Sequence, residues 1–362
     1  MPFFDESHLK LRDQLTRSVG EFKISMVDEE NSEIETAKSY VKKLGALGFL
    51  KYSVPKLDVR SICLCREIFA YHSGLLDFAF AMQGLGCGPI SLFGQDDDKK
   101  RYLDPVSHGE KIAAFALSEA NAGSDPSKLT TSAKKQGEFY LINGEKSWIS
   151  NGGFADFYLT FAKAERGLSC FIVDDGVTLK EQVKIGSPHP VATIEFKNAK
   201  GKLLGNEGDG LKIALSTLDV FRPTVGAAAL GLSKRAFKEA LDYVKNREVF
   251  GQKLSEFQMT QDKLATMATE IEASELLIYK AAWLKDKGQA RITKEASMAK
   301  FYSTESAQRV IDSAVQLFGG LGVTVGSTVE RLYRDIRPLR IYEGTSEIQK
   351  IIIAKQVLNE NH

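Results

Sequence analysis

Glu343 is the residue of this chain whose setting most favours chemistry. It lies in Arg331-Leu-Tyr-Arg-Asp-Ile-Arg-Pro-Leu-Arg-Ile-Tyr-Glu-Gly-Thr-Ser-Glu-Ile-Gln349, where Pro338 disfavours helix before it and Gly344 frees the backbone after the acid. A nearby helix N-terminus lowers the pKa of a carboxylate, whereas burial among apolar neighbours raises it. A raised pKa suits the removal of a proton from carbon. We therefore interpret Glu343 as a catalytic base, although an isolated glutamate is more often a solvated acid.

A helix is predicted to begin just after this acid. Ser346-Glu-Ile-Gln349 reads as a capping box, and Ile348, Ile351 and Ile352 then recur at helical spacing. The next carboxylates to test as the base are Asp219, Glu119 and Glu347.

Composition excludes several other classes of protein. The 362 residues are 43% hydrophobic and 26% charged, which is typical of a globular chain of two or three domains. A net charge of +1 argues against nucleic acid or an anionic membrane as the main partner. We expect a soluble, cytoplasmic protein, because we find no apolar run of roughly 18 residues and no signal peptide. The four cysteines form no metal-ligand pattern and are interpreted as buried free thiols.

The N-terminal part, to about residue 110, reads as helices. Apolar spacing predicts helices around Leu9 to Val19 and Val41 to Leu50, and the apolar stretch from Ile62 to Met82 is interpreted as buried helix. The glycine-rich stretch from Gly84 to Gly94 does not match a dinucleotide loop, and we interpret it as a turn.

Short β-type runs follow Lys111. They begin at Ile112, Phe139, Phe157, Leu168 and Ala192 and are bounded by Gly, Asn and Asp. Asn143-Gly144 predicts a hairpin turn, and Asn151-Gly-Gly153 ends the next run. These strands predict a small antiparallel barrel or sandwich.

Helical spacing returns after Gly205-Asn-Glu-Gly-Asp-Gly210 and lasts to the C-terminus. We expect Pro223 to interrupt the first of these helices or to start a new one, and Gly226 and Gly231 to admit a second backbone closely. Gly319-Gly320 is expected to close a later helix. The fold class is therefore a multidomain α+β protein: a helical domain (1–111), a central β domain (112–205) and a C-terminal helical bundle (206–362).

Several separate motifs, in order, resemble those of the acyl-CoA dehydrogenase family of flavoproteins. Phe115-Ala-Leu-Ser-Glu-Ala-Asn-Ala-Gly-Ser-Asp125 is similar to the family's first signature, and Trp148-Ile-Ser150 to its flavin-edge motif. Arg222-Pro223, Arg247-Glu-Val-Phe-Gly251, Gln316-Leu-Phe-Gly-Gly320 and Tyr342-Glu-Gly-Thr345 resemble its bundle motifs. The resemblance runs from about residue 90 to the C-terminus, and it implies a four-helix bundle at that end.

The resemblance also implies FAD, bound between the β domain and the bundle. Leu117 and Ser118 would contact the flavin pyrimidine, Trp148 would flank the ring, and Ser150 would lie near N5. Read without the family, Trp148 is a core aromatic and Arg247 a solvated charge. Arg247, Gln258 and Gln316 to Gly320 would reach the FAD of a neighbouring subunit, which implies a dimer or tetramer. The full set of implied cofactor residues is Phe115, Leu117, Ser118, Gly123, Ser124, Trp148, Ile149, Ser150, Arg247, Phe250, Gln258, Gln316, Leu317, Gly319, Gly320, Thr345 and Glu347.

The implied substrate is an acyl-CoA, contacted by Ser124, Asp219, Arg222, Tyr342 and Gly344. Glu343 would remove the α proton while the β hydride leaves for flavin N5. The backbone N–H of Glu343 and a flavin hydroxyl would stabilise the enolate oxygen. Electrons would pass to an electron-transferring flavoprotein, in the breakdown of fatty or amino acids.

Two features of the sequence bear on specificity: one departure from the family pattern and one set of bulky or polar residues. Ile185-Gly-Ser-Pro-His-Pro-Val191 replaces a longer loop near the CoA, and His189 in it is interpreted as a turn residue fixed by two prolines rather than a ligand contact. Phe78, Phe80, Gln83 and Phe221 suggest a small pocket for a short, branched or cyclic acyl group; alternatively, these residues face the core.

Alternative functions share this fold. They are an oxidase, a dehydrogenase of a carrier-bound acyl group, and a non-catalytic flavin protein that binds nucleic acid. The last would need a basic face, which the balanced charge opposes.

Overall fold

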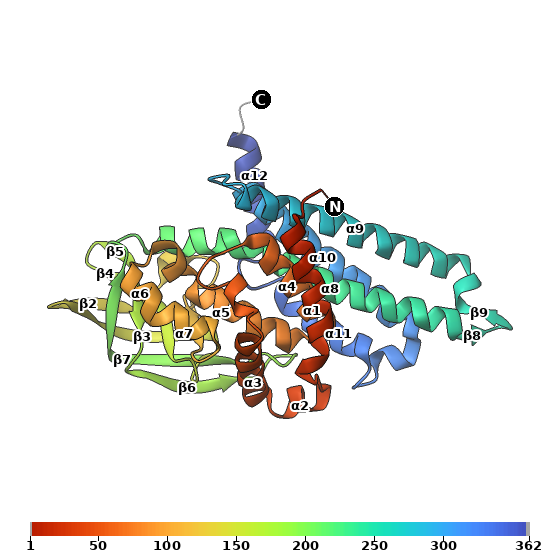
Figure 1. Cartoon of the computed structure of the whole chain (residues 1–362), viewed down its shortest axis with the longest axis horizontal. Coiled ribbons are helices and arrows are strands. Elements are labelled where there is room, and N and C mark those ends of the chain that lie inside the picture. The colour runs from red at the N-terminus through yellow and green to blue at the C-terminus, as the bar shows by residue number, and fades with distance from the viewer. Residues whose placement is uncertain (1, 360–362) are drawn as a thin grey trace. The chain divides into compact units, whose positions relative to one another are not determined.

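The computed structural model describes residues 2–359 and divides into two compact units (Figure 1). The first unit comprises the residues up to 26, residues 59–77 and the residues from 219 onward. The second unit comprises residues 27–58 and 78–218. Each unit is described separately.

The first unit is helical. Its helices are α1 (Glu6–Ser18), α4 (Val59–His72), the larger part of α8 (Gly210–Asn246), α9 (Gln258–Asp286), α10 (Thr293–Phe318), α11 (Thr328–Leu339) and α12 (Ser346–Asn359). A short hairpin of β8 (Glu248–Val249) and β9 (Gln252–Lys253) connects α8 to α9. Helix α10 contacts α9, α11 and α12, so it is the central helix of this unit.

Small residues on α8 allow the helices of the first unit to approach closely. A Cβ on Gly231 would lie 2.1 Å from the carbonyl oxygen of Glu67 on α4. A Cβ on Gly226 would lie 3.1 Å from Ile278 of α9 and 3.2 Å from the Ala299 carbonyl of α10. This confirms the close approach expected at both glycines.

The second unit joins helices to one seven-stranded sheet. Its helices are α2 (Met26–Asn31), α3 (Glu33–Ala46), most of α5 (Gly74–Phe93), α6 (Asp96–Asp98) and α7 (Asp104–Ser107). Its strands are β1 (Ala113–Ala116), β2 (Ser132–Gln136), β3 (Phe139–Ser150), β4 (Phe157–Ala164), β5 (Gly167–Val173), β6 (Val177–Val183) and β7 (Val191–Leu204).

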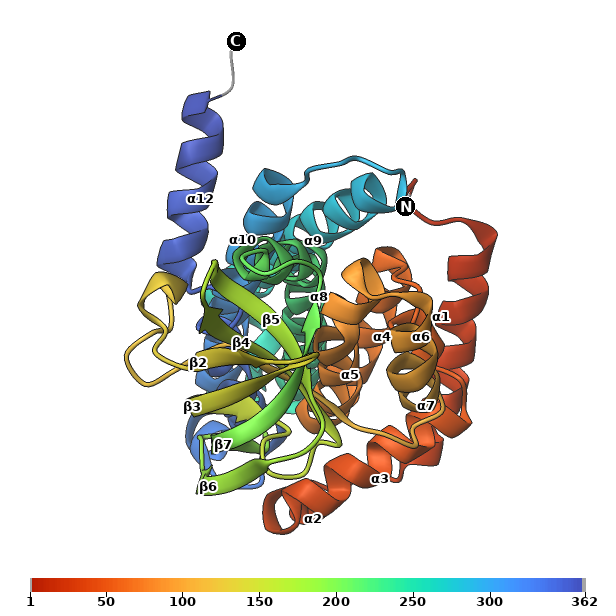
Figure 2. The ribbon, with the colours of Figure 1, turned by 90° about the vertical axis from the view of Figure 1, so that its left-hand side faces the viewer.

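The sheet closes on itself, as the strands in Figure 2 indicate. The pairing β4-β2-β3-β7-β5 returns to β4, while β1 and β6 add to β4 and β7. The β1–β4 and β2–β4 pairs are parallel and the other pairs are antiparallel. Of the two predicted forms, an antiparallel barrel or sandwich, the structure has the barrel, but two of its pairings are parallel, and β2 and β6 were not predicted.

Alternating residues of β4 supply two cores. Phe157, Leu159 and Phe161 belong to a core that includes Cys87 and Ile90 of α5. Tyr158 and Ala162 point the other way, into a core made of barrel residues alone. Burial on both faces explains why β4 is apolar from Phe157 to Ala162, with Thr160 as the one polar residue in that stretch.

Two predicted turns were wrong, because glycines mark close packing there. Gly84 to Gly94 is not a turn, since α5 extends to Phe93. A Cβ on Gly86 would lie 2.7 Å from Ala113, so the glycine admits β1 beside the helix. Asn143-Gly144 is not a hairpin turn but lies within β3 at a shift in register, and a Cβ on Gly144 would meet the Thr131 side chain at 2.7 Å.

Other helix boundaries also differed from the predictions. The run from Ile62 to Met82 is two helices, α4 and α5, which are separated at Ser73. Helix α8 continues through Pro223, because buried neighbours such as Phe221 and Val225 outweigh the roughly 3 kcal/mol cost of an internal proline. Helix α10 ends at Phe318 before Gly319-Gly320, as predicted.

Two helices, α5 and α8, are long and apolar enough to cross a membrane by length and composition, which the sequence-based prediction missed. Their most apolar windows are 89% and 78% buried inside the protein. Such burial is typical of core helices, so we assign no membrane span. The four cysteines are buried free thiols, as expected.

Candidate active site

Glu343 lies in a short loop of the first unit between α11 and α12. Helix α11 includes Pro338 and ends at Leu339, so the proline does not stop the helix before it, contrary to the prediction. Helix α12 begins at Ser346, just after Glu343, as predicted. Glu343 has a φ of 54°, a left-handed conformation that is uncommon for a residue with a side chain. Such strain persists only where surrounding contacts hold it, and it is often found at functional sites.

The contacts that hold this loop differ from the predicted capping box. The Ser346 hydroxyl donates to Glu305, and Gln349 Nε2 donates to the carbonyl oxygens of Glu343 (3.2 Å) and Gly344 (2.9 Å). Lys300 Nζ on α10 donates to the Gly344 carbonyl as well, at 2.8 Å. The capping box is therefore wrong, because both of its side chains are used to fix the loop.

The Glu343 carboxylate is buried and unpaired. Neither of its oxygens has a hydrogen-bond partner among the described residues. Burial raises the pKa of Glu343 above its usual value, while the positive charges of Arg66, Lys300 and Arg222 oppose that rise. A desolvated carboxylate without a bound donor is suited to accept a proton from a substrate.

Arg66 contributes positive charge near Glu343, but it donates hydrogen bonds to Asp77 and Thr224 rather than to the Glu343 carboxylate. Its Nε and NH2 groups donate to the two carboxylate oxygens of Asp77 at 2.9 and 2.8 Å, and NH1 donates to Thr224 at 3.0 Å. Burial acts to lower the pKa of the Arg66 guanidinium, but the charge and hydrogen bonds of Asp77 have the larger combined effect. The pKa of Arg66 is therefore raised above its usual value. Arg66 therefore stays charged.

Arg222 is held by an acidic partner on its own helix. Its NH1 group donates to Asp219 at 2.6 Å, and Thr293 donates to the second Asp219 oxygen at 2.7 Å. The buried Nε of Arg222 has no partner among the described residues, and burial lowers the pKa of Arg222. This donor is available to an acceptor on a ligand.

The three alternative base candidates are all engaged or exposed. Asp219 is bound by Arg222 and Thr293. Glu119 accepts from Lys146, Thr130 and Thr131, and Glu347 lies on the surface. Among these four carboxylates, Glu343 alone combines buried oxygens with the absence of a donor from the described residues.

In the second unit, the loop after β1 is fixed by a buried ion pair. Lys146 Nζ lies 2.9 Å from Glu119 and donates to the Leu117 carbonyl at 3.0 Å, while Ser147 N–H donates to the Ser118 carbonyl at 3.0 Å. Both carbonyls thus already accept a hydrogen bond. Among the described residues, the Ser118 hydroxyl forms no hydrogen bond, so it is available to a ligand.

Trp148 is not a core aromatic. The register of β3 shifts between Lys146 and Ile149, Trp148 has a φ of 56°, and its side chain is 55% exposed. Ile149, the next residue, is buried. The bulge therefore turns a flat apolar ring outward, which suits contact with a planar ligand.

Ser150 follows at the end of β3 and contacts His189. The Ser150 Oγ and His189 Nε2 atoms are 2.9 Å apart, and the His189 ring lies 4.1 Å from the Phe78 ring, centroid to centroid. Pro188 and Pro190 on either side of His189 are buried. His189 is fixed between two prolines, as interpreted, and also binds the serine expected near flavin N5.

The remaining predicted cofactor residues lie at separate places in the two units. Phe115, Gly123 and Ser124 belong to the second unit, in β1 and the exposed loop after it. Residues of the first unit are exposed around the β8–β9 hairpin and the end of α10: Arg247, Phe250, Gln258, Gln316, Gly319 and Gly320; Leu317 is half-buried. Thr345 and Glu347 flank the start of α12, and Tyr342 directly precedes Glu343.

Gln83 does not shape a small acyl pocket, so that part of the prediction was wrong. Gln83 is fully buried, its Oε1 accepts from Ala113 N–H at 3.0 Å, and its Nε2 donates to the Ala79 carbonyl at 3.3 Å. Phe78, Phe80 and Phe221 are also buried. Gln83 is a core residue with satisfied hydrogen bonds, which agrees with the alternative interpretation.

Sequence reasoning missed Arg66, Asp77, Lys146 and Lys300. A usable signal existed for the first two, because charged residues inside the apolar run from Ile62 to Met82 must be paired when that run is buried. The two lysines lie in ordinary helix and strand patterns that give no such signal.

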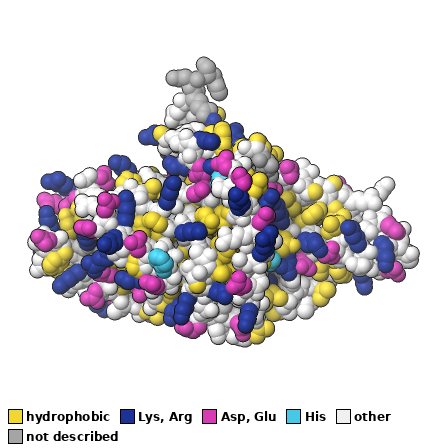
Figure 3. All heavy atoms as spheres, viewed as in Figure 1, with side chains coloured by type: hydrophobic (Ala, Val, Ile, Leu, Met, Phe, Trp, Pro, Cys, Tyr) yellow, Lys and Arg dark blue, Asp and Glu magenta, His cyan; other side chains and the backbone are white. Residues whose placement is uncertain are grey.

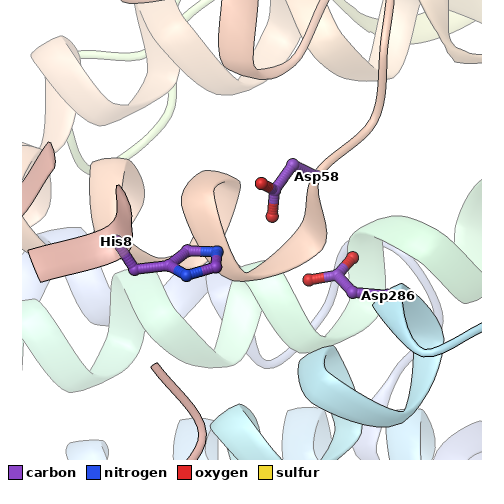
Figure 4. A group of neighbouring side chains, drawn as sticks. All are labelled: His8, Asp58 and Asp286. Atoms are coloured by element: carbon purple, nitrogen blue, oxygen red, sulfur yellow. The ribbon is translucent and has the colours of Figure 1, made fainter. Parts of the chain in front are cut away.

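Figure 4 draws three residues of types that can bind metals: His8 of α1 and Asp286 at the end of α9, both of the first unit, and Asp58, which belongs to the second unit and precedes α4 in the chain. The Asp286 carboxylate accepts from Arg60 Nε at 2.8 Å and from Val59 N–H at 2.9 Å. Its charge is already matched by an arginine, so we assign no metal there.

Comparisons with known proteins give matches over nearly the full length of the chain. Models of the acyl-CoA dehydrogenase N-terminal, middle and C-terminal domains match residues 5–110, 114–199 and 208–358. A 3-(aryl)acrylate reductase of Clostridium sporogenes is 37% identical, covering 98% of this chain and 100% of that protein. The caffeyl-CoA reductase-Etf complex subunit CarC of Acetobacterium woodii is 35% identical, covering 99% and 100%. The solved butyryl-CoA dehydrogenase of Megasphaera elsdenii is 31% identical with a TM-score of 0.87, covering 98% and 99%.

Proposed function

Because the chain belongs to the acyl-CoA dehydrogenase family, whose reaction is the α,β-dehydrogenation of an acyl-CoA, we propose that Glu343 is the base of that reaction in this protein. One observation carries the proposal: a carboxylate in a strained loop, buried, with both oxygens unpartnered among the described residues. Ionised Glu343 would take the proton from the α carbon of the thioester. Burial raises the pKa of Glu343, and the nearby positive charges of Arg66, Lys300 and Arg222 oppose that rise.

FAD is the proposed cofactor. The residues of the second unit fit a flavin: a loop whose carbonyls are occupied and whose Ser118 hydroxyl forms no hydrogen bond among the described residues, an outward-turned indole, and a serine hydroxyl at the end of the same strand. When bound, FAD supplies the acceptor for the β hydride, which no side chain can provide. Leu117, Ser118, Trp148 and Ser150 would hold and orient it.

For the substrate, we propose a CoA thioester with a short, branched or cyclic acyl group. Gln83 gives no support for this choice, which rests instead on the similarity to a butyryl-CoA dehydrogenase and to reductases of aryl-acrylate type. Arg222, whose Nε is buried without a partner among the described residues, and Tyr342 are the proposed contacts on the first unit. Initial flavin-bleaching rates with butyryl-, isobutyryl-, octanoyl- and palmitoyl-CoA test this: a preference for the two longest would defeat it.

Reduction of an enoyl thioester is a second candidate, because two relatives matched over 98% and 99% of this chain have reductase names. The same residues serve the reverse reaction, in which protonated Glu343 returns a proton to the α carbon. Stopped-flow reoxidation of the reduced enzyme by cinnamoyl-CoA, compared with reduction by its saturated counterpart, reports which direction is favoured.

We further propose an electron-transferring flavoprotein as redox partner and a homodimer or homotetramer as the assembly. The Acetobacterium woodii relative is named as part of an Etf complex. In the first unit, Phe250 at the β8–β9 hairpin is 98% exposed, and Arg247 and Gln316 are exposed too. A second subunit would bury this ring. Light scattering during size-exclusion chromatography would measure the mass of the assembly. A monomer with full FAD content would contradict the proposed dimer or tetramer.

A nucleic-acid-binding role receives no support from the face of the molecule that Figure 3 shows. Figure 3 shows Lys and Arg side chains interspersed with Asp and Glu on the visible face rather than gathered by sign. Interspersed charges do not make the basic stripe that a phosphate backbone requires.

An anaerobic screen of acyl-CoA thioesters for loss of the flavin absorbance tests the function as a whole. At least one thioester is expected to bleach the flavin, and the Glu343→Gln variant should bleach far more slowly. A preparation that binds no FAD would overturn the proposal.

A further inference from the structure

Lys300 is a buried cation with few partners among the described residues. It lies on α10, its side chain is 0% exposed, and its Nζ donates a hydrogen bond to the Gly344 carbonyl at 2.8 Å. An ammonium group has three donors and is costly to bury without compensation. A carbonyl dipole compensates only part of its charge.

The charged groups that face Lys300 come from several elements. They are Glu343 in the loop, Arg222 on α8, Glu305 on α10 itself and Glu347 on α12. Glu305 is already bound by Arg340 at 2.8 Å and by Ser346, and Glu347 is exposed. Within this group, Glu343 is therefore the one buried carboxylate that lacks a donor from the described residues.

Glu343 in turn is faced by Arg66 on α4, Asp77 on α5, Arg222 on α8 and Lys300 on α10. The charge of Arg66 is balanced by Asp77 and that of Arg222 by Asp219, each through a direct ion pair. Among the described residues, no carboxylate in contact cancels the charge of Lys300. Its field and its hydrogen bond both act on the residue pair Glu343-Gly344.

We propose that Lys300 is a positioning residue for the base: it holds the Gly344 carbonyl so that Glu343 keeps its left-handed conformation, and its charge keeps the unpaired carboxylate ionised. The inference rests on the proposed role of Glu343. Gln349 shares the first task, since it donates to the same carbonyl, but it has no charge and cannot share the second. Variants of Lys300 and Gln349 can therefore distinguish the effect of the hydrogen bond to Gly344 from the effect of the positive charge.

Three variants of the FAD-loaded protein test the proposal. Lys300→Met removes both the charge and the donor, Lys300→Gln removes the charge and keeps an amide donor, and Gln349→Met removes a donor and keeps the charge. Lys280→Met, on the exposed face of α9, is the matched control for loss of a lysine. Lys300→Gln guards against the case in which Lys300→Met fails to fold.

The first readout is the pH dependence of flavin reduction by an acyl-CoA. Removing a nearby positive charge destabilises the carboxylate form, so the pKa of the base should rise by about one unit or more in both Lys300 variants. At a pH below that pKa, the rate should fall about tenfold for each unit by which the pKa rises. Gln349→Met should lower the rate without moving the profile, and Lys280→Met should change neither.

The second readout does not depend on turnover. Infrared titration should show the Glu343 carboxyl band, identified by its loss in Glu343→Gln, converting to carboxylate at higher pH in the Lys300 variants. An unchanged titration in soluble Lys300→Gln would overturn the proposal. Suppose instead that Glu343→Gln reduced its flavin at the wild-type rate while the Lys300 variants still shifted the titration of the Glu343 band. The proposed function would then fail, but the electrostatic coupling of Lys300 to Glu343 would stand.

Discussion

Ser150 Oγ lies 2.9 Å from His189 Nε2, so a histidine from the loop before β7 binds the hydroxyl at the end of β3. A serine hydroxyl can donate to only one acceptor at a time, and the imidazole sets which way it points. If Ser150 contacts bound FAD, His189 decides whether that contact is a donor.

His189→Phe keeps a ring against Phe78 and removes the hydrogen bond to Ser150. The absorption maxima and the midpoint potential of the bound FAD should shift, and Ser150→Ala should shift them comparably. Combining the two changes should add little, because each removes the same interaction. Fully additive shifts would show that His189 acts on the flavin independently of Ser150.

The buried Glu119–Lys146 pair should matter for stability. Lys146→Met leaves Glu119 buried with a charge and without its cation, which costs about 3–5 kcal/mol. Chemical denaturation should show this loss, with Lys134→Met on the exposed side of β2 as the control. A Lys146→Met variant as stable as the control would mean that the threonine donors suffice.

The Glu119–Lys146 pair also predicts how the free energy of unfolding depends on pH. Although burial works to raise it, hydrogen bonds from Lys146, Thr131 and Thr130 lower the pKa of Glu119 to about 2. Its contribution to stability is therefore present above its unfolded pKa of about 4.5 and is lost as the pH falls toward 2. The free energy of unfolding of Glu119→Gln should accordingly be less sensitive to pH in this window than that of the wild type.

Gly231 is predicted to tolerate no side chain. A Cβ there would lie 2.1 Å from the Glu67 carbonyl oxygen, so Gly231→Ala should separate α8 from α4 and lower stability by about 1–3 kcal/mol. Gly20→Ala is the control, because nothing lies within 4 Å of its Cβ position. Equal melting temperatures for the two variants would contradict this packing.

The sequence predicted the order of helical and β regions because periodicity reports which faces are buried. It failed where tertiary contact overrides local preference: Gly144 reads as a turn but fits beside Thr131, and Pro223 reads as a break but lies in a buried helix. Glu343 was identifiable from its loop and its neighbours in the motif. Lys300 was not, because only the fold brings α10 to the Gly344 carbonyl.

The rate of flavin reduction in Glu343→Gln is the sharpest test of Glu343 as the base. Glutamine keeps the size of the side chain and removes the base, so stopped-flow reduction by a saturating acyl-CoA should slow by at least about 10²–10⁴-fold. FAD content should stay at the wild-type level, and the control variant Glu272→Gln, at an exposed position on α9, should reduce normally. Reduction of the Glu343→Gln flavin at the wild-type rate would refute this role, because the base would then be another residue.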